Sequence, residues 1–180
     1  MTDIKVSTTS QLRLRPPSVE DAASIWRIVN ESGVLDRNSS YLYLLMCRDF
    51  ARTCLVAESD GEVVGFVIGY RPPDRPHVLF VWQIAVAPAA QGQGLGLRLL
   101  TDLVRRCNGD EFPEYVDATI APSNTASRRL FQALATTFDT QLTEASGFAE
   151  SDFPPGDHEA EPVIRIGPLS QASCMNPGAF

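Results

Sequence analysis

The segment from Val78 to Cys107 constrains the fold more than any other part of this 180-residue chain. Residues 78–86 form a mostly apolar run that predicts a buried strand, and Pro88 ends it. A glycine-rich turn follows, and apolar residues then recur at the spacing of a helix. Backbone N–H groups in the first turn of such a helix have no partner within the helix and favour an anion. The sequence therefore predicts a site for a phosphate or pyrophosphate group.

The rest of the chain predicts one mixed α/β domain. We expect residues 11–168 to form it, with residues 1–10 and 169–180 as flexible termini. The expected strands span residues 12–15, 53–58, 62–70, 78–86, 115–121 and 163–166; the expected helices span 19–32, 41–50, the stretch from the glycine-rich turn to 107, and 122–138. Residues 139–161 are acidic and rich in Gly and Pro, which predicts mostly loop.

Composition excludes some classes of function. The net charge of −7 argues against a nucleic-acid binder, which needs a basic surface to neutralise phosphates. No apolar run approaches the ~20 residues of a membrane helix, and the polar N-terminus lacks the apolar core of a signal peptide. The four cysteines form no paired motif, so we expect no metal site and a reducing, cytoplasmic location.

Three kinds of glycine-rich turn bind phosphate groups, and the spacing separates them. A dinucleotide-binding turn needs GxGxxG early in a parallel unit, and a P-loop needs a Lys that this turn lacks. The third pattern is Gln/Arg-x-x-Gly-x-Gly/Ala, which Gln91, Gly94 and Gly96 match. Together with the preceding strand, the following helix and Asn124, this turn resembles the acetyl-coenzyme A signature of the GNAT superfamily of N-acetyltransferases.

The resemblance implies a splayed, mostly antiparallel sheet flanked by helices, with acetyl-coenzyme A as cosubstrate. The strands at 78–87 and 115–121 would separate, and the pantetheine arm would lie in the gap. The resemblance implies that backbone groups of Ile84, Ala85 and Val86 pair with this arm. The implied pyrophosphate site comprises the N–H groups of Gln91, Gly92, Gln93, Gly94, Leu95 and Gly96. Asn124 would contact the arm, although it could equally cap its helix.

One position departs from the superfamily pattern. Many members carry a Tyr general acid where this chain has Phe131, and a phenyl ring cannot protonate a leaving thiolate. Either another group does so or the thiolate leaves unaided, which its pKa of about 8.5 permits. The departure also leaves open a non-catalytic module that binds acyl-coenzyme A.

Three further stretches are similar to one family within the superfamily, the diaminobutyrate acetyltransferases of ectoine biosynthesis. They are residues 35–41, residues 64–83 with their Gly-Tyr-Arg-Pro-Pro and Phe-Val-Trp-Gln segments, and residues 153–166. The resemblance implies acetyl transfer to the 4-amino group of L-2,4-diaminobutyrate, and a homodimer. A GNAT enzyme for another small amine is the alternative, because only the acceptor loops distinguish the two.

A small diamino acid needs carboxylates for its ammonium groups and a donor for its own carboxylate. Asp36, His158 and Glu161 lie in loops where substrate residues are usually found. Tyr41 and Trp82 could offer aromatic faces to an ammonium group. We expect direct attack in a ternary complex, with neutral His158 or a water held by Glu161 as proton acceptor.

Ordinary structural roles remain open for several of these residues. Asp36 could cap the helix that follows it, and His158 could be an exposed loop residue. Trp82 shares strand parity with Ile84, which is typical of a core residue. Glu159 reads as solvated surface, and Arg165 as either a structural cation or a carboxylate clamp.

Overall fold

The computed structural model describes residues 12–33, 35–107, 112–156 and 158–171. Seven strands form one sheet in the order β1-β2-β3-β4-β5-β7-β6. Their bounds are β1 Arg13–Arg15, β2 Cys54–Ser59, β3 Glu62–Tyr70, β4 Val78–Val86, β5 Tyr115–Thr119, β6 Leu142–Phe148 and β7 Glu161–Ile166. Every neighbouring pair is antiparallel except β4 and β5. The predicted mixed, mostly antiparallel sheet is confirmed.

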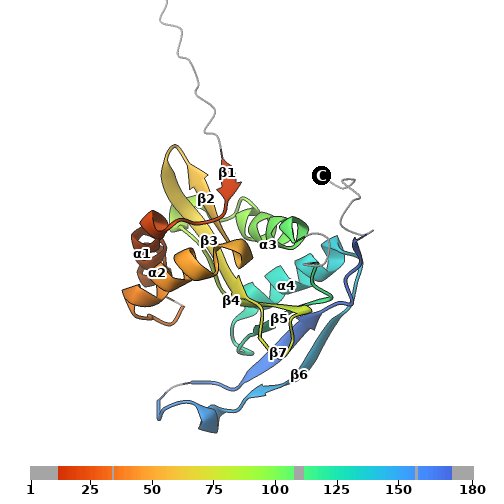
Figure 1. Ribbon diagram of the computed structural model, residues 1–180. Coiled ribbons are helices and arrows are strands. Elements are labelled where there is room, and N and C mark those ends of the chain that lie inside the picture. The colour runs from red at the N-terminus through yellow and green to blue at the C-terminus, as the bar shows by residue number, and fades with distance from the viewer. Residues whose placement is uncertain (1–11, 34, 108–111, 157, 172–180) are drawn as a thin grey trace, which may run out of the picture.

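Four helices cover the two faces of this sheet (Figure 1). They are α1 Ala22–Ser32, α2 Ser40–Asp49, α3 Leu95–Arg106 and α4 Thr125–Thr137. Two buried clusters separate the faces: α1 and α2 pack on one through residues such as Tyr43, and α3 and α4 pack on the other through residues such as Leu99 and Phe131. Because each helix is apolar along one side, it is stable only against the sheet.

The prediction of loop between 139 and 161 is wrong, because β6 lies inside that range. β6 is the last strand of the sheet and pairs only with β7. Six of its seven residues are exposed, so it lacks the apolar alternation that marks a half-buried strand. One end of the β6–β7 hairpin packs against α4 through Ile164 and Ile166, and the other end extends away from the helices (Figure 1).

β4 and β5 separate soon after they meet. The two strands pair only through Val78–Phe80 and Tyr115–Asp117. Beyond these residues β4 continues along β3 as far as Val86, whereas β5 continues along β7. The second half of β4 therefore has a strand on one side only, which is the divergence that the sequence resemblance implied.

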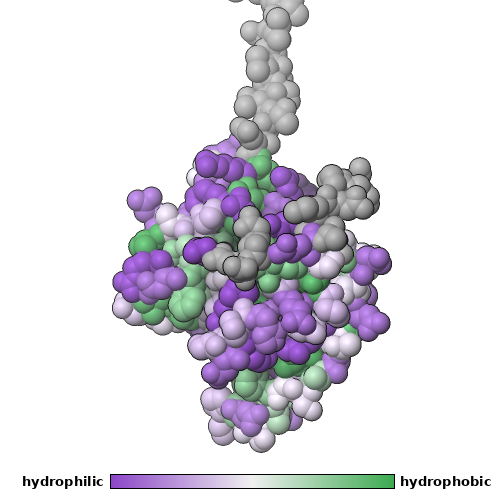
Figure 2. Space-filling model, turned by 45° about the vertical axis from the view of Figure 1, so that its right-hand side comes forward, coloured by the Kyte–Doolittle hydropathy of each residue, from purple (hydrophilic) through white to green (hydrophobic). Residues whose placement is uncertain are grey.

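The helices and the surface of the molecule bear on the expectations from composition. In the described residues, no helix is long and apolar enough to cross a membrane. Hydrophilic residues dominate the middle of the face seen in Figure 2, with smaller hydrophobic areas between them.

Leu169, placed in a flexible terminus by the sequence, is 8% exposed and donates its N–H to the carbonyl of Glu114. Residues 1–10 and 172–180 lie outside the described residues.

Candidate active site

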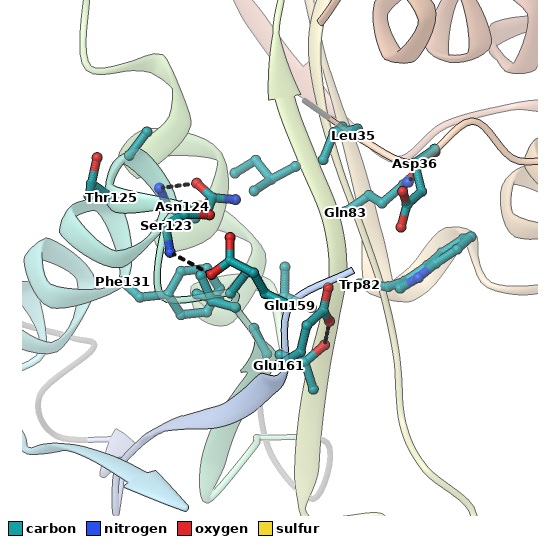
Figure 3. A pocket seen from close by; sticks show the side chains of 18 of the residues that line it. Leu35, Asp36, Trp82, Gln83, Ser123, Asn124, Thr125, Phe131, Glu159 and Glu161 are labelled. Carbon is teal, nitrogen blue, oxygen red and sulfur yellow. Dashed lines mark hydrogen bonds between the residues drawn. The ribbon is translucent and has the colours of Figure 1, made fainter. Parts of the chain in front are cut away.

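A cavity of about 580 Å³ opens where β4 and β5 separate. Side chains from five segments line it: the α1–α2 loop, the middle of β4, the end of β5, the start of α4 and residues 158–161 (Figure 3). The cavity thus lies at the point where the sheet offers unpaired backbone. Of the predicted site residues, it brings together Asp36, Trp82, Ile84, Asn124, His158 and Glu161.

A β-bulge at Trp82 sets the orientation of the central residues of β4. Ile68 pairs with Gln83 and Gly69 with Val81, so Trp82 is an extra residue in its strand. The extra residue shifts the alternation of side chains between the two faces of the sheet. Val81 and Ile84, three residues apart, therefore both pack on the α3–α4 side, whereas Trp82 packs on the α1–α2 side. The parity argument for Trp82 as a core neighbour of Ile84 is therefore wrong.

Three carboxylates line the cavity, and its described lining includes no Lys or Arg. Asp36 lies on the same side of β4 as Trp82, and Glu159 and Glu161 approach from the opposite side (Figure 3). Oε2 of Glu161 accepts a 2.7 Å hydrogen bond from the hydroxyl of Thr119. Such a lining favours a cationic ligand.

Glu159 also has a defined partner. Its Oε2 accepts the backbone N–H of Ser123 at 3.3 Å, just before α4. The positive end of the helix dipole stabilises a carboxylate at that place. Glu159 is exposed, as the sequence predicts, and it also lines the cavity.

His158 is half-buried at the cavity and lies against an aromatic side chain. Its ring stacks on Phe153 with centroids 4.7 Å apart and planes 7° from parallel. Phe153 in turn contacts Phe148 of β6 edge to face at 6.3 Å. Stacking on Phe153 fixes the plane of the imidazole, which is what a proton acceptor needs.

The start of α4 confirms the capping alternative for Asn124. Its Oδ1 accepts the N–H of Ser127 at 3.1 Å, which is the N-cap hydrogen bond. For Asp36 the capping alternative is wrong, because the side chain of Ser39 caps α2 by accepting the N–H of Tyr41. The carboxylate of Asp36 instead lies at the cavity.

The glycine-rich turn lies outside the cavity lining, as do Ala85 and Val86. Gly92 and Gly94 have φ angles of +75° and +71°, which only glycine adopts without strain. α3 begins at Leu95, and Arg98 is the first residue whose N–H bonds back into it, to Gly94. The N–H groups of the first turn of α3 are those at which the sequence predicts an anion site.

Tyr41 and Arg165 lie apart from the cavity. Tyr41 is 62% exposed, whereas Tyr43 is fully buried. Residues two apart in a helix point about 200° away from each other around its axis, so the two rings lie on opposite sides of α2. Arg165 donates two hydrogen bonds, of 2.8 and 2.7 Å, to the fully buried carboxylate of Asp117. Its guanidinium also lies 4.8 Å over the ring of Tyr115. Of the two alternatives for Arg165, the structural cation is the one observed.

Comparison with known proteins identifies the family. A family model described as acetyltransferase (GNAT) family matches residues 20–135. An L-2,4-diaminobutyric acid acetyltransferase from Halalkalibacterium halodurans is 48% identical over 155 residues, covering 85% of this chain and 80% of that protein. One from Streptomyces anulatus is 48% identical over 160 residues, covering 88% and 91%. The chain belongs to the L-2,4-diaminobutyric acid acetyltransferase family.

A solved member of this family has the same fold. Diaminobutyrate acetyltransferase EctA from Paenibacillus lautus, in complex with its substrate L-2,4-diaminobutyric acid and coenzyme A, matches with a TM-score of 0.83. The two sequences are 36% identical, and the match covers 94% of this chain and 99% of that one. The predicted GNAT fold is confirmed.

Several polar residues of the cavity lining were not predicted from the sequence. Asn38, Gln83, Thr119 and Ser123 line the cavity beside the predicted residues. A signal existed for Gln83 alone: a polar side chain inside an apolar strand needs a buried partner. Phe131 is 2% exposed and also lines the cavity, so the position of the usual Tyr offers no hydroxyl. Among the described residues, no group of His, Cys, Asp and Glu could hold a metal ion.

Proposed function

We propose that this protein transfers the acetyl group of acetyl-coenzyme A to the 4-amino group of L-2,4-diaminobutyrate, giving the N4-acetyl product in ectoine biosynthesis. The observation that carries the proposal is the cavity between β4 and β5, which is lined by Trp82 and by the carboxylates of Asp36, Glu159 and Glu161. Membership of the family supports the same activity.

The charges of the cavity match such a substrate. Diaminobutyrate carries two ammonium groups, and the carboxylates approach from both sides of β4. The indole of Trp82 adds an aromatic face that attracts a cation. The hydroxyl and amide groups at the start of α4, with His158, can donate hydrogen bonds to the single carboxylate of the substrate. Tyr41 is exposed and is not part of the cavity lining, so the proposal gives it no contact with the substrate.

The backbone fits coenzyme A in two places. Residues 84–86 of β4 pair with β3 on one side and have no β5 residue opposite them on the other. The pantetheine arm can therefore add beside them as a short strand. The turn Gln91–Gly96 would hold the pyrophosphate with backbone N–H groups, and Asn124 would contact the arm from the α4 side. When bound, acetyl-coenzyme A supplies a thioester whose carbonyl carbon accepts the amine.

The reaction needs two protons removed from the nitrogen, one before and one after it attacks, and one negative charge stabilised. Only the free amine attacks, so neutral His158, or a water held by Glu161, accepts the ammonium proton. The amine nitrogen then bonds to the carbonyl carbon, the carbon–sulfur bond breaks, and the nitrogen releases its second proton to water. A backbone N–H of residues 83–86 would stabilise the developing oxyanion. Phe131 has no proton to give, so the sulfur leaves as the thiolate.

Two finer points belong to the same proposal. We expect a homodimer, and the uncovered face of β6, with six of its seven residues exposed, offers a surface for it. Light scattering at several concentrations tests this point. We also place the reaction in the bacterial cytoplasm, where acetyl-coenzyme A is made.

Thiol release tests the proposed activity. The purified protein is supplied with acetyl-coenzyme A and L-2,4-diaminobutyrate, ornithine, lysine or putrescine in parallel. We expect turnover on diaminobutyrate to exceed that on the others by more than tenfold in kcat/KM. Preferred turnover on another amine would support an enzyme for a different small amine. Binding of the cofactor without any turnover would support a non-catalytic module.

A further inference from the structure

Gln83 is a polar side chain at the centre of the sheet, and it is only 5% exposed. It follows Trp82 at the bulge of β4 and faces the α1–α2 side. The hydroxyl of Tyr43 on α2 lies 3.0 Å from its Oε1, and its Nε2 lies 3.1 Å from the backbone carbonyl of Asp36. Both ends of the amide are therefore bonded, one to a helix and the other to the loop that carries Asp36.

The direction of this chain of hydrogen bonds is fixed. The carbonyl of Asp36 can only accept, so the NH₂ of Gln83 must face it and the amide oxygen must face Tyr43. The Tyr43 hydroxyl must then donate. Tyr43 is fully buried, and burial raises the pKa of its hydroxyl, against the opposite effect of hydrogen bonds with Asn38 and Gln83. The hydroxyl therefore keeps its proton.

The segment held by these hydrogen bonds also contacts α1 and α2 directly, because the N–H of Leu35 bonds to Oγ of Ser32 at 3.2 Å and Asn38 bonds to the hydroxyl of Tyr43. Residues 35–39 form no helix or strand, and the side chain of Asp36 is exposed at the cavity. The Asp36 carbonyl also accepts a 3.1 Å hydrogen bond from Nδ2 of Asn38. Two amide donors thus meet on one backbone oxygen and fix the residue whose carboxylate faces the substrate. Gln83 is the donor anchored in the sheet, next to Trp82.

We propose that Gln83 and Tyr43 are positioning residues that act through Asp36: they hold its backbone so that its carboxylate stays beside Trp82 and selects the diamino acid. This inference rests on the proposed function for its substrate. It assigns no contact with the substrate to either residue. It predicts that the chain Tyr43–Gln83–Asp36 affects affinity for the amine and not for acetyl-coenzyme A.

The first variant is Tyr43→Phe, which keeps the ring and leaves Oε1 of Gln83 without its donor. Tyr70→Phe is the matched control, because it removes the same atom from a half-buried ring that packs on Phe80 outside the cavity lining. We expect Tyr43→Phe to raise KM for diaminobutyrate at least about twofold, the smallest effect of losing one neutral hydrogen bond, because the lost hydroxyl bonds to both Gln83 and Asn38. We expect kcat and KM for acetyl-coenzyme A to stay within twofold.

A double-mutant cycle separates positioning from a general loss of stability. In an Asp36→Ala background the carboxylate is absent, so Tyr43→Phe should no longer change KM for diaminobutyrate. Equal effects of Tyr43→Phe with and without the Asp36 carboxylate would overturn the proposal. An equal rise in both KM values would overturn it as well.

Amide hydrogen exchange tests the same chain without any turnover. We expect peptides that cover residues 35–39 to exchange faster in Tyr43→Phe than in the wild-type protein, with no change in Tyr70→Phe. Unchanged exchange in Tyr43→Phe would overturn the positioning role even if the enzyme acetylates diaminobutyrate. Faster exchange in a protein that acetylates no diamino acid would uphold the anchoring and overturn the proposed function alone.

Discussion

The hydroxyl of Thr119 donates a 2.7 Å hydrogen bond to one carboxylate oxygen of Glu161, so the other oxygen is the one left for a ligand. The two residues come from different strands, β5 and β7, on the side of the cavity opposite Asp36. The contact restricts the rotation of a charged side chain on the first residue of β7.

Replacing Thr119 with Val removes that hydroxyl while keeping the shape of the side chain. We expect kcat/KM for diaminobutyrate to fall about ten- to thirtyfold, near the lower end of what a hydrogen bond to a charged group contributes. Thr119→Ser keeps the hydroxyl and should stay within twofold of the wild-type protein. Steady-state kinetics on both variants measure this, and equal losses in the two would contradict it.

The stack between Phe153 and His158 predicts a second kinetic effect. Phe153→Ala removes the surface that fixes the imidazole plane, and we expect kcat/KM to fall about three- to tenfold, since such aromatic pairs contribute about 0.5–1.5 kcal/mol. Phe153→Tyr keeps the ring and should retain activity. Wild-type rates in Phe153→Ala would mean that His158 has no role that depends on its orientation.

Asp117 predicts an effect on stability alone. Its buried carboxylate accepts hydrogen bonds from Arg165 and, at 3.3 Å, from Arg75. Asp117→Asn leaves these cations without their charge partner, and we expect about 2–4 kcal/mol lower stability in urea unfolding. KM for diaminobutyrate should not change in the folded protein. Asp49→Asn, at an exposed pair with Arg48, is the control and should leave the unfolding midpoint unchanged.

The cysteines predict the absence of a covalent acetyl-enzyme. Burial raises the pKa of the Cys54 thiol to about 11 and that of Cys47 to about 12. A thiol is protonated below its pKa, so at pH 8 only about one Cys54 in a thousand is a thiolate. In a Cys174→Ser background we expect neither Cys54 nor Cys47 to react with a thiol reagent before unfolding. Cys54→Ala should turn over within twofold of that background. An acetylated thiol seen by mass spectrometry after a single turnover would contradict this.

Local signals made much of the fold predictable. The bounds of β4 and the turn that opens α3 follow from an apolar run, a proline and spaced glycines, all of which act within a few residues. β6 was not predicted, because it is stabilised by pairing with β7 while most of its side chains are exposed to solvent. An edge strand of this kind needs no apolar alternation.

The site was predictable in its residue types more than in its geometry. Asp36, His158 and Glu161 follow from the needs of a diamino acid and from the family resemblance, and they do line one cavity. The bulge at Trp82 could not be inferred, because it depends on how β3 and β4 pair. The exposure of Tyr41 could not be inferred either, because the sequence does not show which side of α2 meets the sheet.

The position of the acetyl group on the product tests the central claim most directly. Wild-type protein is incubated with acetyl-coenzyme A and L-2,4-diaminobutyrate, and the product is examined by NMR. If the carboxylates of Asp36, Glu159 and Glu161 orient the diamino acid in the cavity between β4 and β5, a single product acetylated at N4 will appear. Acetylation at N2, a mixture of the two, or no acetylated amino acid would contradict the account.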